Sequence, residues 1–384
     1  MRDAVIVDAV RAPIGRRNGA LKGVHPVDLS AAVLTALATR NQLDPKLIED
    51  VIWGCVTQIA DQSTNVGRLA VLAAGWPEAI PGVTLDRACG SSQQALHFAA
   101  ASVIAGHYDL VVAGGVESMS RVPLGAARAT GEPFGPRVRA RYQRDSFSQG
   151  LGAEEVARRW GLPRTRLDEF ALESHRKAAA AIDGGAFAGQ LAPITGSDGK
   201  LTADEGVRRD TSLEKLAALR PAFAEGGVIH AGNSSQISDG CAALLVTTSE
   251  RAAELGLRPL VRFHAGAVTG DDPVTMLTAP IPATAKVLKR AGLTIDDIGV
   301  FEVNEAFASV PLAWQAETGA DHAKLNPLGG AIAVGHPLGA SGAILMTRMV
   351  HHMRANGIRY GLQTMCEAGG MANATVVELL ADEG

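Results

Sequence analysis

The chain has 384 residues, which is more than one small hydrophobic core holds, so we expect two or three domains or two fused halves. Hydrophobic residues make up 47% and charged residues 20%, a balance that excludes a disordered or fibrous protein. The formal net charge of −4 argues against nonspecific nucleic-acid binding, which requires a basic surface, so we expect no nucleic-acid partner.

The cysteines and the N-terminal segment indicate the compartment. Four cysteines in so long a chain do not form a disulfide framework and suit a reducing environment. No pair of them has the spacing of metal ligands, so we expect no metal site. The chain enters an apolar segment at residue 4, which leaves no room for a signal peptide, and no apolar run reaches the length of a membrane span. We therefore expect a cytoplasmic protein.

An internal repeat with an offset of 250 residues organises the chain. Residues 43–53 align with 293–303, and each copy follows an alanine-rich helical pattern and enters a β-like stretch. The same offset places 89–92 on 339–342, where small residues open a helix in both copies. Chance similarity of alanine- and glycine-rich sequence is the alternative, but the shared offset at two separate places favours duplication.

Strands that alternate with helices predict βαβ units, mostly parallel sheets and an α/β fold. We place the N-terminal half at 1–250 and the C-terminal half at 257–384. Residues from about 118 to 235 are rich in arginine, glycine and proline, with one helix expected at about 167–182. This stretch is interpreted as a subdomain inserted in the first half, a natural place for a lid that grips a ligand.

Cys89 lies at a predicted junction between a strand and a helix, within residues 83–94. The free amides and the positive dipole end of a helix N-terminus stabilise an anion, so we expect this thiol to have a lowered pKa. Such a thiolate is a strong nucleophile and can carry an acyl group as a thioester. The alternative is a small buried hydrophobic residue, which describes most free cysteines.

Three further segments carry candidate chemistry. Asn304 stands where a strand gives way to a helix, His336 precedes a helix start, and Cys366 ends a strand. Taken singly, they have ordinary explanations as a helix cap, a hydrogen-bonded structural histidine and a core residue. Together with Cys89 they supply a nucleophile, a neutral imidazole base, a second acid or base and donors for an oxyanion, which is the equipment of acyl transfer.

The chain resembles the thiolase family, the acyl-CoA:acetyl-CoA C-acyltransferases, over nearly its whole length. The order and spacing of the matching stretches are more specific than any one of them. The resemblance implies duplicated βαβαβ halves that form a layered α-β-α-β-α core, with an inserted lid or loop subdomain. The matching stretches are the Cys89 segment, 114–120, 231–235, 304–308, the His336 run and the Cys366 run.

The resemblance also implies the roles of the reacting groups. Cys89 is expected to be the acylated nucleophile and His336 the group that activates it. Cys366 is expected to move a proton at the α-carbon of acetyl-CoA. Asn304, through a water, and His336 are expected to polarise one thioester carbonyl, and backbone amides near Cys89 and Ala368 to hold the other oxyanion. No metal and no tightly bound cofactor is expected; coenzyme A and acyl-CoA thioesters are the substrates.

The resemblance assigns CoA binding and the lid to other positions. Arg208, which follows an Asp-Glu pair, is expected to contact the nucleotide end of CoA, although a solvated surface charge is the alternative reading. Ser235 matches a serine that binds the pantetheine arm. Short-chain acetoacetyl-CoA thiolases carry His-Met-Gly in the lid, where this chain has serine followed by Gln149 and Gly150. That difference favours a degradative enzyme with a roomier acyl pocket.

Two departures from the family pattern concern the second cysteine. Ala368 replaces the first of three consecutive glycines, and alanine tolerates a positive φ poorly. Glu367 places a carboxylate beside Cys366, which is expected to raise the pKa of that thiol.

The predicted reaction is cleavage of 3-ketoacyl-CoA by CoA to acetyl-CoA and a shortened acyl-CoA, a reversible Claisen condensation through an acyl-cysteine. A biosynthetic acetyl-CoA acetyltransferase remains an alternative. A ketoacyl-synthase-like condensing enzyme lacks a second catalytic cysteine, and a non-catalytic subunit has no need of Cys89 or His336. A homodimer or homotetramer is expected. Acyl length and branching, the physiological direction and the pathway stay open.

Overall fold

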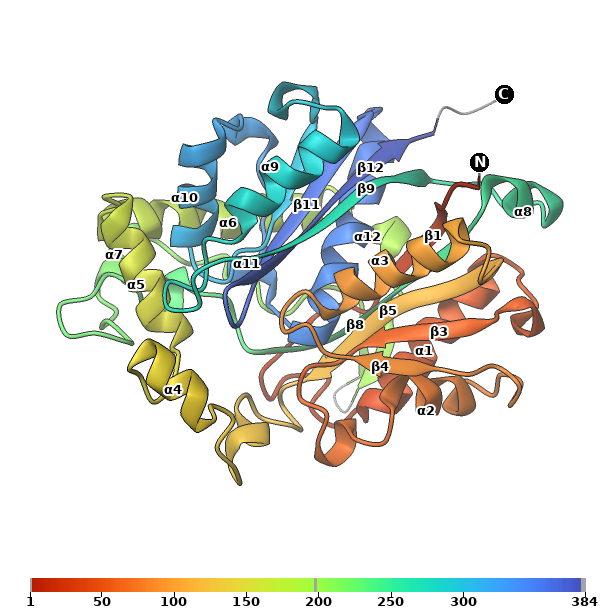
Figure 1. The fold of residues 1–384 in the computed structure, drawn as a ribbon, viewed down its shortest axis with the longest axis horizontal. Helices are drawn as coiled ribbons and strands as arrows, with labels where there is room; N and C mark the ends of the chain where they lie inside the picture. Colours follow the sequence, from red (N-terminus) through yellow and green to blue (C-terminus); the bar gives the residue numbers. More distant parts are fainter. Residues whose placement is uncertain (1, 197–198, 381–384) are drawn as a thin grey trace.

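The computed structural model describes residues 2–196 and 199–380. Its main sheet is mixed and runs in the order β10-β11-β12-β9-β1-β8-β5-β3-β4, with β2 attached to β8 (Figure 1). The strands are β1 (Val5–Arg11), β2 (Gly15–Arg16), β3 (Asp50–Gly54), β4 (Val83–Leu85), β5 (Leu110–Ser118), β8 (Ser238–Thr247), β9 (Val261–Gly270), β10 (Val300–Val303), β11 (Tyr360–Glu367) and β12 (Met371–Leu379).

The strand order confirms the predicted duplication. From the central pair outward, one half reads β1-β8-β5-β3 and the other reads β9-β12-β11-β10. β3 and β10 begin at residues 50 and 300, and β5 and β11 begin at 110 and 360, so both pairs keep the offset of the sequence repeat. The halves join where Val5 and Ile6 of β1 pair with Arg262 and Val261 of β9.

The expectation of mostly parallel sheets is wrong. β3 pairs in parallel with β4 and β5, and β10 pairs in parallel with β11, but the remaining pairs are antiparallel. In the second half the reason is the connection: only residues 368–370 join β11 to β12, and so short a turn cannot make the crossover that parallel strands need.

The helices form the remaining layers of the α-β-α-β-α arrangement (Figure 1). α3 and α12 pack on each other between the two half-sheets, α1 and α2 cover the outer face of the first half, and α9 covers that of the second. α12 is buried from Gly339 to Val350, and the buried stretch includes the polar Thr347 and Arg348. These helices are α1 (Pro26–Arg40), α2 (Val66–Ala73), α3 (Ser91–Ile104), α8 (Ser249–Glu254), α9 (Pro280–Ala291), α10 (Ser309–Thr318), α11 (Ala331–Val334) and α12 (Leu338–Asn356).

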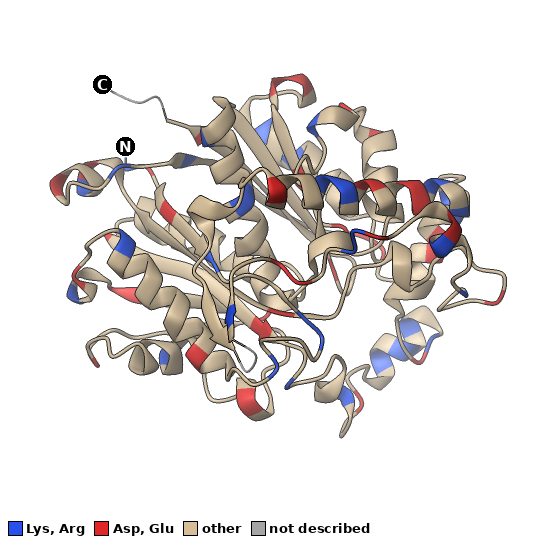
Figure 2. Ribbon diagram, turned by 180° about the vertical axis from the view of Figure 1, so that it is seen from behind, with Lys and Arg blue, Asp and Glu red and all other residues tan. Residues whose placement is uncertain are grey.

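The segment between β5 and β8 has its own secondary structure and packs beside α10 and α11. The helix predicted at about 167–182 is confirmed as α6. Figure 2 shows basic residues concentrated on α4, whose arginines are exposed or half-buried. No helix within the described ranges is long and apolar enough to cross a bilayer. The elements of this segment are α4 (Pro136–Tyr142), α5 (Gln149–Arg159), α6 (Arg164–Asp183), β6 (Ile194–Gly196), β7 (Gly199–Leu201) and α7 (Leu213–Ala217).

A buried ion pair fastens this segment to the sheet. The Arg11 guanidinium on β1 makes two hydrogen bonds to the Asp204 carboxylate, at 2.7 and 3.0 Å, and both side chains are fully buried. Arg11 Nε also donates to Gln190 Oε1 at 2.7 Å, and the Ile14 amide donates to Asp204 at 2.8 Å. Such a pair holds only while both partners are present, because each charge alone is costly to bury.

Replacing Arg11 with methionine leaves Asp204 buried without its cation. We expect the free energy of unfolding to fall by about 3–5 kcal/mol, measured by urea denaturation. The matched control is Arg209→Met, because the Arg209–Asp183 pair lies at the surface and its loss is expected to leave the midpoint nearly unchanged. Equal effects of the two variants would contradict this account of the contact.

Candidate active site

Cys89 stands in a strained turn between β4 and α3. Ala88, just before it, has a φ of +46°, a left-handed conformation that is costly for a residue with a Cβ. Two polar contacts maintain the turn: Asp86 Oδ1 accepts from the Ala88 amide at 2.6 Å, and Ser91 Oγ accepts from the Arg87 amide at 2.9 Å. The strand-to-helix junction predicted for Cys89 is therefore confirmed, whereas the strain at Ala88 had no sequence signal.

The expectation that Cys89 has a lowered pKa is wrong. The side chain is buried against Leu338, Leu345 and Met365. Burial raises the pKa of the Cys89 thiol well above its ordinary value, and the charges of Cys366 and Glu367 raise it further. Desolvation of a thiolate outweighs the modest stabilisation that a helix N-terminus provides. The resting group is a thiol, and it must lose a proton to become a nucleophile.

Cys366 lies at the end of β11 and is also buried. Burial, followed by the charge of Glu367, raises the pKa of the Cys366 thiol to about 12, which confirms the expected influence of Glu367. The backbone strain that a positive φ would cause at Ala368 is not present. In the turn after Cys366 the left-handed positions are taken by Gly369 and Gly370, with φ of +88° and +75°, and Ala368 is not among the residues with positive φ.

His336 and Asn304 lie side by side. Asn304 follows β10, and its Nδ2 is 3.4 Å from His336 Nε2. On the other side of the ring, His336 Nδ1 is 2.6 Å from Ser341 Oγ on the first turn of α12. Burial lowers the pKa of His336 to about 4, so the imidazole is neutral at physiological pH.

The hydrogen bonds around Ser341 fix the tautomer of this imidazole. The Ser341 hydroxyl donates its single hydrogen to the Pro337 carbonyl at 2.9 Å, so toward His336 it acts as the acceptor. Nδ1 of His336 therefore carries the proton, and Nε2 keeps its lone pair, toward which Asn304 Nδ2 makes a long contact at 3.4 Å. A neutral imidazole with an available Nε2 is equipped to accept a proton.

The four predicted groups come from distant parts of the chain and are linked by contacts. Met365, next to Cys366, packs on Cys89, and Leu338, two residues after His336, packs against the same cluster. The backbone N–H of Asn304 donates to the Thr364 carbonyl on β11 at 3.1 Å. This bond ties Asn304 to the strand that carries Cys366 near its end. The N-termini of α3 and α12 and the ends of β10 and β11 thus supply two thiols, an imidazole and an amide.

A pocket beside this centre contains one predicted CoA-binding residue. Arg208 lies at its exposed rim, and the Arg208 amide donates to His175 Nδ1 at 3.0 Å. Ser235 is next to the pocket residue Gln236, and its amide donates to the Ala306 carbonyl at 2.9 Å. The wall combines apolar side chains with Arg208 and with Lys215, which is paired with the lining Asp210 at 2.7 Å, and such a mixed wall suits a ligand with both polar and aliphatic parts. Further lining residues are Leu216, Leu219, Gly232 and Ile332.

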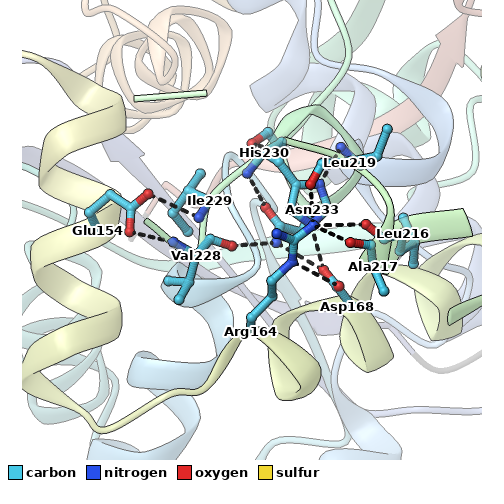
Figure 3. Close-up of polar contacts among 12 residues, drawn as sticks. Glu154, Arg164, Asp168, Leu216, Ala217, Leu219, Val228, Ile229, His230 and Asn233 are labelled. Carbon is cyan, nitrogen blue, oxygen red and sulfur yellow. Dashed lines mark hydrogen bonds and ion pairs between the residues drawn. The ribbon is translucent and has the colours of Figure 1, made fainter. Parts of the chain in front are cut away.

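A buried polar network supports one wall of this pocket (Figure 3). Asp168 on α6 accepts from His230 Nε2 at 2.7 Å and from Asn233 Nδ2 at 3.1 Å, and Asn233 Oδ1 accepts from the His230 amide at 2.9 Å. Glu154 on α5 holds the amides of Val228 and Ile229 at 2.9 and 3.0 Å. Sequence reasoning included Asn233 in the matching stretch 231–235 but missed Glu154, Asp168 and His230; a polar Asp168 on the apolar face of α6 was the available signal.

The lid positions lie at the start of α5. Gly150 is buried, and a Cβ at this position would collide with the ring of Phe223. Phe223 meets Phe307 edge to face, with ring centroids 5.9 Å apart, and Phe307 is three residues after Asn304. Gln149 is half-buried on the same turn. The segment at Gly150 thus reaches the Asn304 segment through two aromatic rings, and a larger residue at Gly150 would displace the ring of Phe223.

Two family models match the chain: the thiolase N-terminal domain over residues 4–250 and the thiolase C-terminal domain over residues 257–379. The protein belongs to the thiolase family. It is 48% identical to the steroid 3-ketoacyl-CoA thiolase FadA6 of Mycobacterium tuberculosis, over 99% of this chain and 95% of the relative. It is 44% identical to the 3-ketoacyl-CoA thiolase of Idiomarina loihiensis, over 98% and 100%.

A solved structure is similar throughout. The crystal structure of the Bacillus anthracis acetyl-CoA acetyltransferase matches with a TM-score of 0.91 and 36% identity, over 99% of both chains. This agreement confirms the predicted thiolase-like fold class.

The tautomer assignment predicts the effect of Ser341→Ala. Loss of the acceptor removes about 1 kcal/mol of preference for a proton on Nδ1, which changes the tautomer ratio about fivefold. Nitrogen-15 NMR of labelled histidine, assigned with a His336→Gln variant, measures this ratio. Thr347→Val removes another buried hydroxyl of α12, which bonds to the Ala343 carbonyl, and serves as the control. An unchanged His336 spectrum in Ser341→Ala would contradict the assignment.

Proposed function

We propose that this protein cleaves 3-ketoacyl-CoA with CoA to acetyl-CoA and a shortened acyl-CoA, through an acyl group carried on Cys89. Two observations support the proposal: Cys89 and Cys366 are buried thiols close enough for the charge of one to raise the pKa of the other, and His336 is neutral and lies against Asn304. One thiol serves as nucleophile, and the other serves as proton donor to carbon. Cleavage is favoured over synthesis because the relatives at 48% and 44% identity are named 3-ketoacyl-CoA thiolases.

The first half-reaction forms the acyl-enzyme. His336 Nε2 takes the Cys89 proton as the sulfur attacks the 3-keto carbon; the C2–C3 bond then breaks and its electron pair passes to C2. Cys366, whose raised pKa of about 12 keeps it protonated, gives its proton to C2, and acetyl-CoA leaves. The second half-reaction reverses the roles: Cys366 thiolate takes the proton of CoA, the CoA sulfur attacks the acyl carbon, and Cys89 regains a proton from His336.

Two sets of donors stabilise the charge that develops on oxygen. Asn304, through a water, and His336 act on the thioester carbonyl that becomes the enolate. Backbone amides at Cys89 and Ala368 act on the other oxyanion. The strained turn at Ala88 and the glycines after Ala368 support this assignment, because both turns present backbone close to the sulfurs. Arg208 and Ser235 hold CoA, and Gln149 and Gly150 border the acyl pocket.

The competing functions are less well supported. A decarboxylating condensing enzyme has no use for a second buried thiol coupled to the nucleophile, and a non-catalytic subunit has no use for a fixed His336 tautomer. A biosynthetic acetyl-CoA acetyltransferase remains the second candidate, because the matching solved structure carries that title.

The proposal includes the setting of the reaction. CoA thioesters are the substrates, no tightly bound cofactor takes part, and the enzyme acts in the cytoplasm as a homodimer or homotetramer. The two halves are 1–250, with the inserted 118–235, and 257–384; residues 1, 197–198 and 381–384 of these ranges lie outside the described residues. Among the described side chains, no group of three or more His, Cys, Asp or Glu is placed to hold a metal ion.

Replacing Cys89 with alanine tests the function directly. We expect no acetyl-CoA from a 3-ketoacyl-CoA and free CoA, with the fold retained by circular dichroism, because no other group can carry the acyl chain. Cys241→Ala is the matched control: this thiol is buried on β8, where it contacts Ser30, and its loss is expected to leave turnover intact. Thiolysis by the Cys89→Ala variant would refute the assignment, and synthase activity without acetyl-CoA release would refute the reaction.

Replacing Arg208 with alanine tests the CoA site. The KM for CoA is expected to rise about fivefold with kcat unchanged, the scale of one charge-assisted phosphate contact at a solvated position. Arg209→Ala removes a neighbouring arginine that is engaged by Asp183 and is expected to leave KM unchanged. Steady-state kinetics at varied CoA concentration measures this KM. An unchanged KM in Arg208→Ala would show that Arg208 is a solvated surface charge and does not bind CoA.

A further inference from the structure

The two halves carry equivalent buried carboxylates that the proposed mechanism does not use. Glu117 near the end of β5 and Glu367 at the end of β11 are fully buried and lie at corresponding places of the repeat. Each lies against the helix start of the other half. A Cβ on Gly339 of α12 would lie 2.8 Å from Glu117 Oε2, and a Cβ on Gly90, at the start of α3, would collide with the Glu367 carboxyl.

The two carboxylates differ in their partners. Glu117 accepts from the Gly339 amide at 2.9 Å, from Gln62 Nε2 at 2.7 Å and from the amides of residues 56 and 57 at 2.9 and 3.1 Å. Neither oxygen of Glu367 meets a donor at hydrogen-bonding geometry within the described chain, and the neighbouring Asn373 Oδ1 is likewise unpaired. Glu117 is a structural clamp that binds backbone amides of both halves. Glu367 occupies the corresponding position of the repeat but makes no such hydrogen bonds.

The surroundings of Glu367 favour its neutral form at neutral pH. Burial raises the pKa of Glu367 to about 8; the charge of Arg87 and the approach of the Asn373 backbone amide, which falls short of hydrogen-bonding geometry, lower this pKa, and the charge of Asp86 raises it. The titratable groups that face this region are listed here by element: Arg87, Asp86 and Cys89 from the turn before α3, His97 from α3, Cys366 from β11, and Glu117 from β5, whose charge also acts on Cys89. Burial lowers the pKa of His97 to about 4, so it contributes no charge.

We propose that Glu367 is a positioning residue that acts by charge through the two thiols: as the neutral acid it permits Cys89 and Cys366 to lose protons, and as the carboxylate it holds both protonated. This inference rests on the proposed function. Its geometric basis is the contact of one carboxyl with the residue after Cys89 and its covalent adjacency to Cys366.

The sign of the pH dependence follows. As the pH rises through about 8, Glu367 ionises, and its negative charge raises the pKa of both thiols. In the wild type, the fraction of each cysteine present as thiolate therefore increases less steeply with pH near pH 8. Glutamine at position 367 stays neutral at every pH, so both thiols should ionise at lower pH in the Glu367→Gln variant.

The experiment measures the rate of alkylation of Cys89 by iodoacetamide from pH 7 to 11, by mass spectrometry of the peptide that contains it. We expect the midpoint to be about one pH unit lower in Glu367→Gln than in wild type. Glu367→Asp, which keeps a carboxyl, should restore most of the wild-type behaviour. The alkaline limb of the thiolysis pH profile should shift in the same direction, which loss of packing alone would not produce.

Glu302→Gln is the matched control. Glu302 on β10 is also buried without hydrogen-bond partners, and burial raises its pKa to about 7, but its charge is coupled to Arg348, Glu305 and Lys177. We expect the Cys89 midpoint to stay at its wild-type value in this variant. Equal shifts in Glu302→Gln and Glu367→Gln, or no shift in Glu367→Gln, would overturn the inference.

The pH dependence of Cys89 alkylation in the wild type tests the inference even if the variants do not fold. The logarithm of its alkylation rate should flatten near pH 8, where Glu367 ionises, before rising again; a single ionisation of unit slope would overturn the inference. Alkylation needs no turnover, so these results are independent of thiolysis by Cys89→Ala. An unshifted midpoint defeats only the role of Glu367, and thiolysis without Cys89 defeats the proposed function.

Discussion

Burial of the reacting groups at the meeting of the two halves is the constraint on which the rest of the structure depends. Desolvation is the largest influence on Cys89, Cys366 and His336 alike: it keeps both thiols protonated and the imidazole neutral. These three groups therefore rest uncharged, and in the proposed reaction each proton moves as a bond to carbon forms or breaks.

The duplicated architecture places those groups at one centre. The central layer contains one buried helix from each half, α3 and α12. The N-terminus of each helix lies against a strand end of the opposite half. The Glu117 clamp on Gly339 shows how tightly the halves are joined, since one carboxylate binds backbone amides of both. The repeat thus provides two similar frames with different residues at their helix starts: Cys89 before α3 and His336 before α12.

Much of this arrangement could be predicted from local patterns. The offset of 250 residues, the junction at Cys89 and the strand end at Cys366 are properties of short segments, and the structure agrees with each. The pKa of Cys89 could not be predicted in the same way, because it depends on Leu345 and Met365, which are far away in sequence. The left-handed Ala88 and the Ser341 contact that orients His336 likewise depend on neighbours that only the folded chain supplies.

The most direct test of the central claim is to trap the acyl group. Wild-type protein mixed with a 3-ketoacyl-CoA in the absence of free CoA should release one acetyl-CoA per active site, and the peptide that contains Cys89 should gain the mass of the shortened acyl chain. Added CoA should then discharge that mass as acyl-CoA. An acyl mass on any other residue, or release of acetyl-CoA with Cys89 unmodified, would contradict the account.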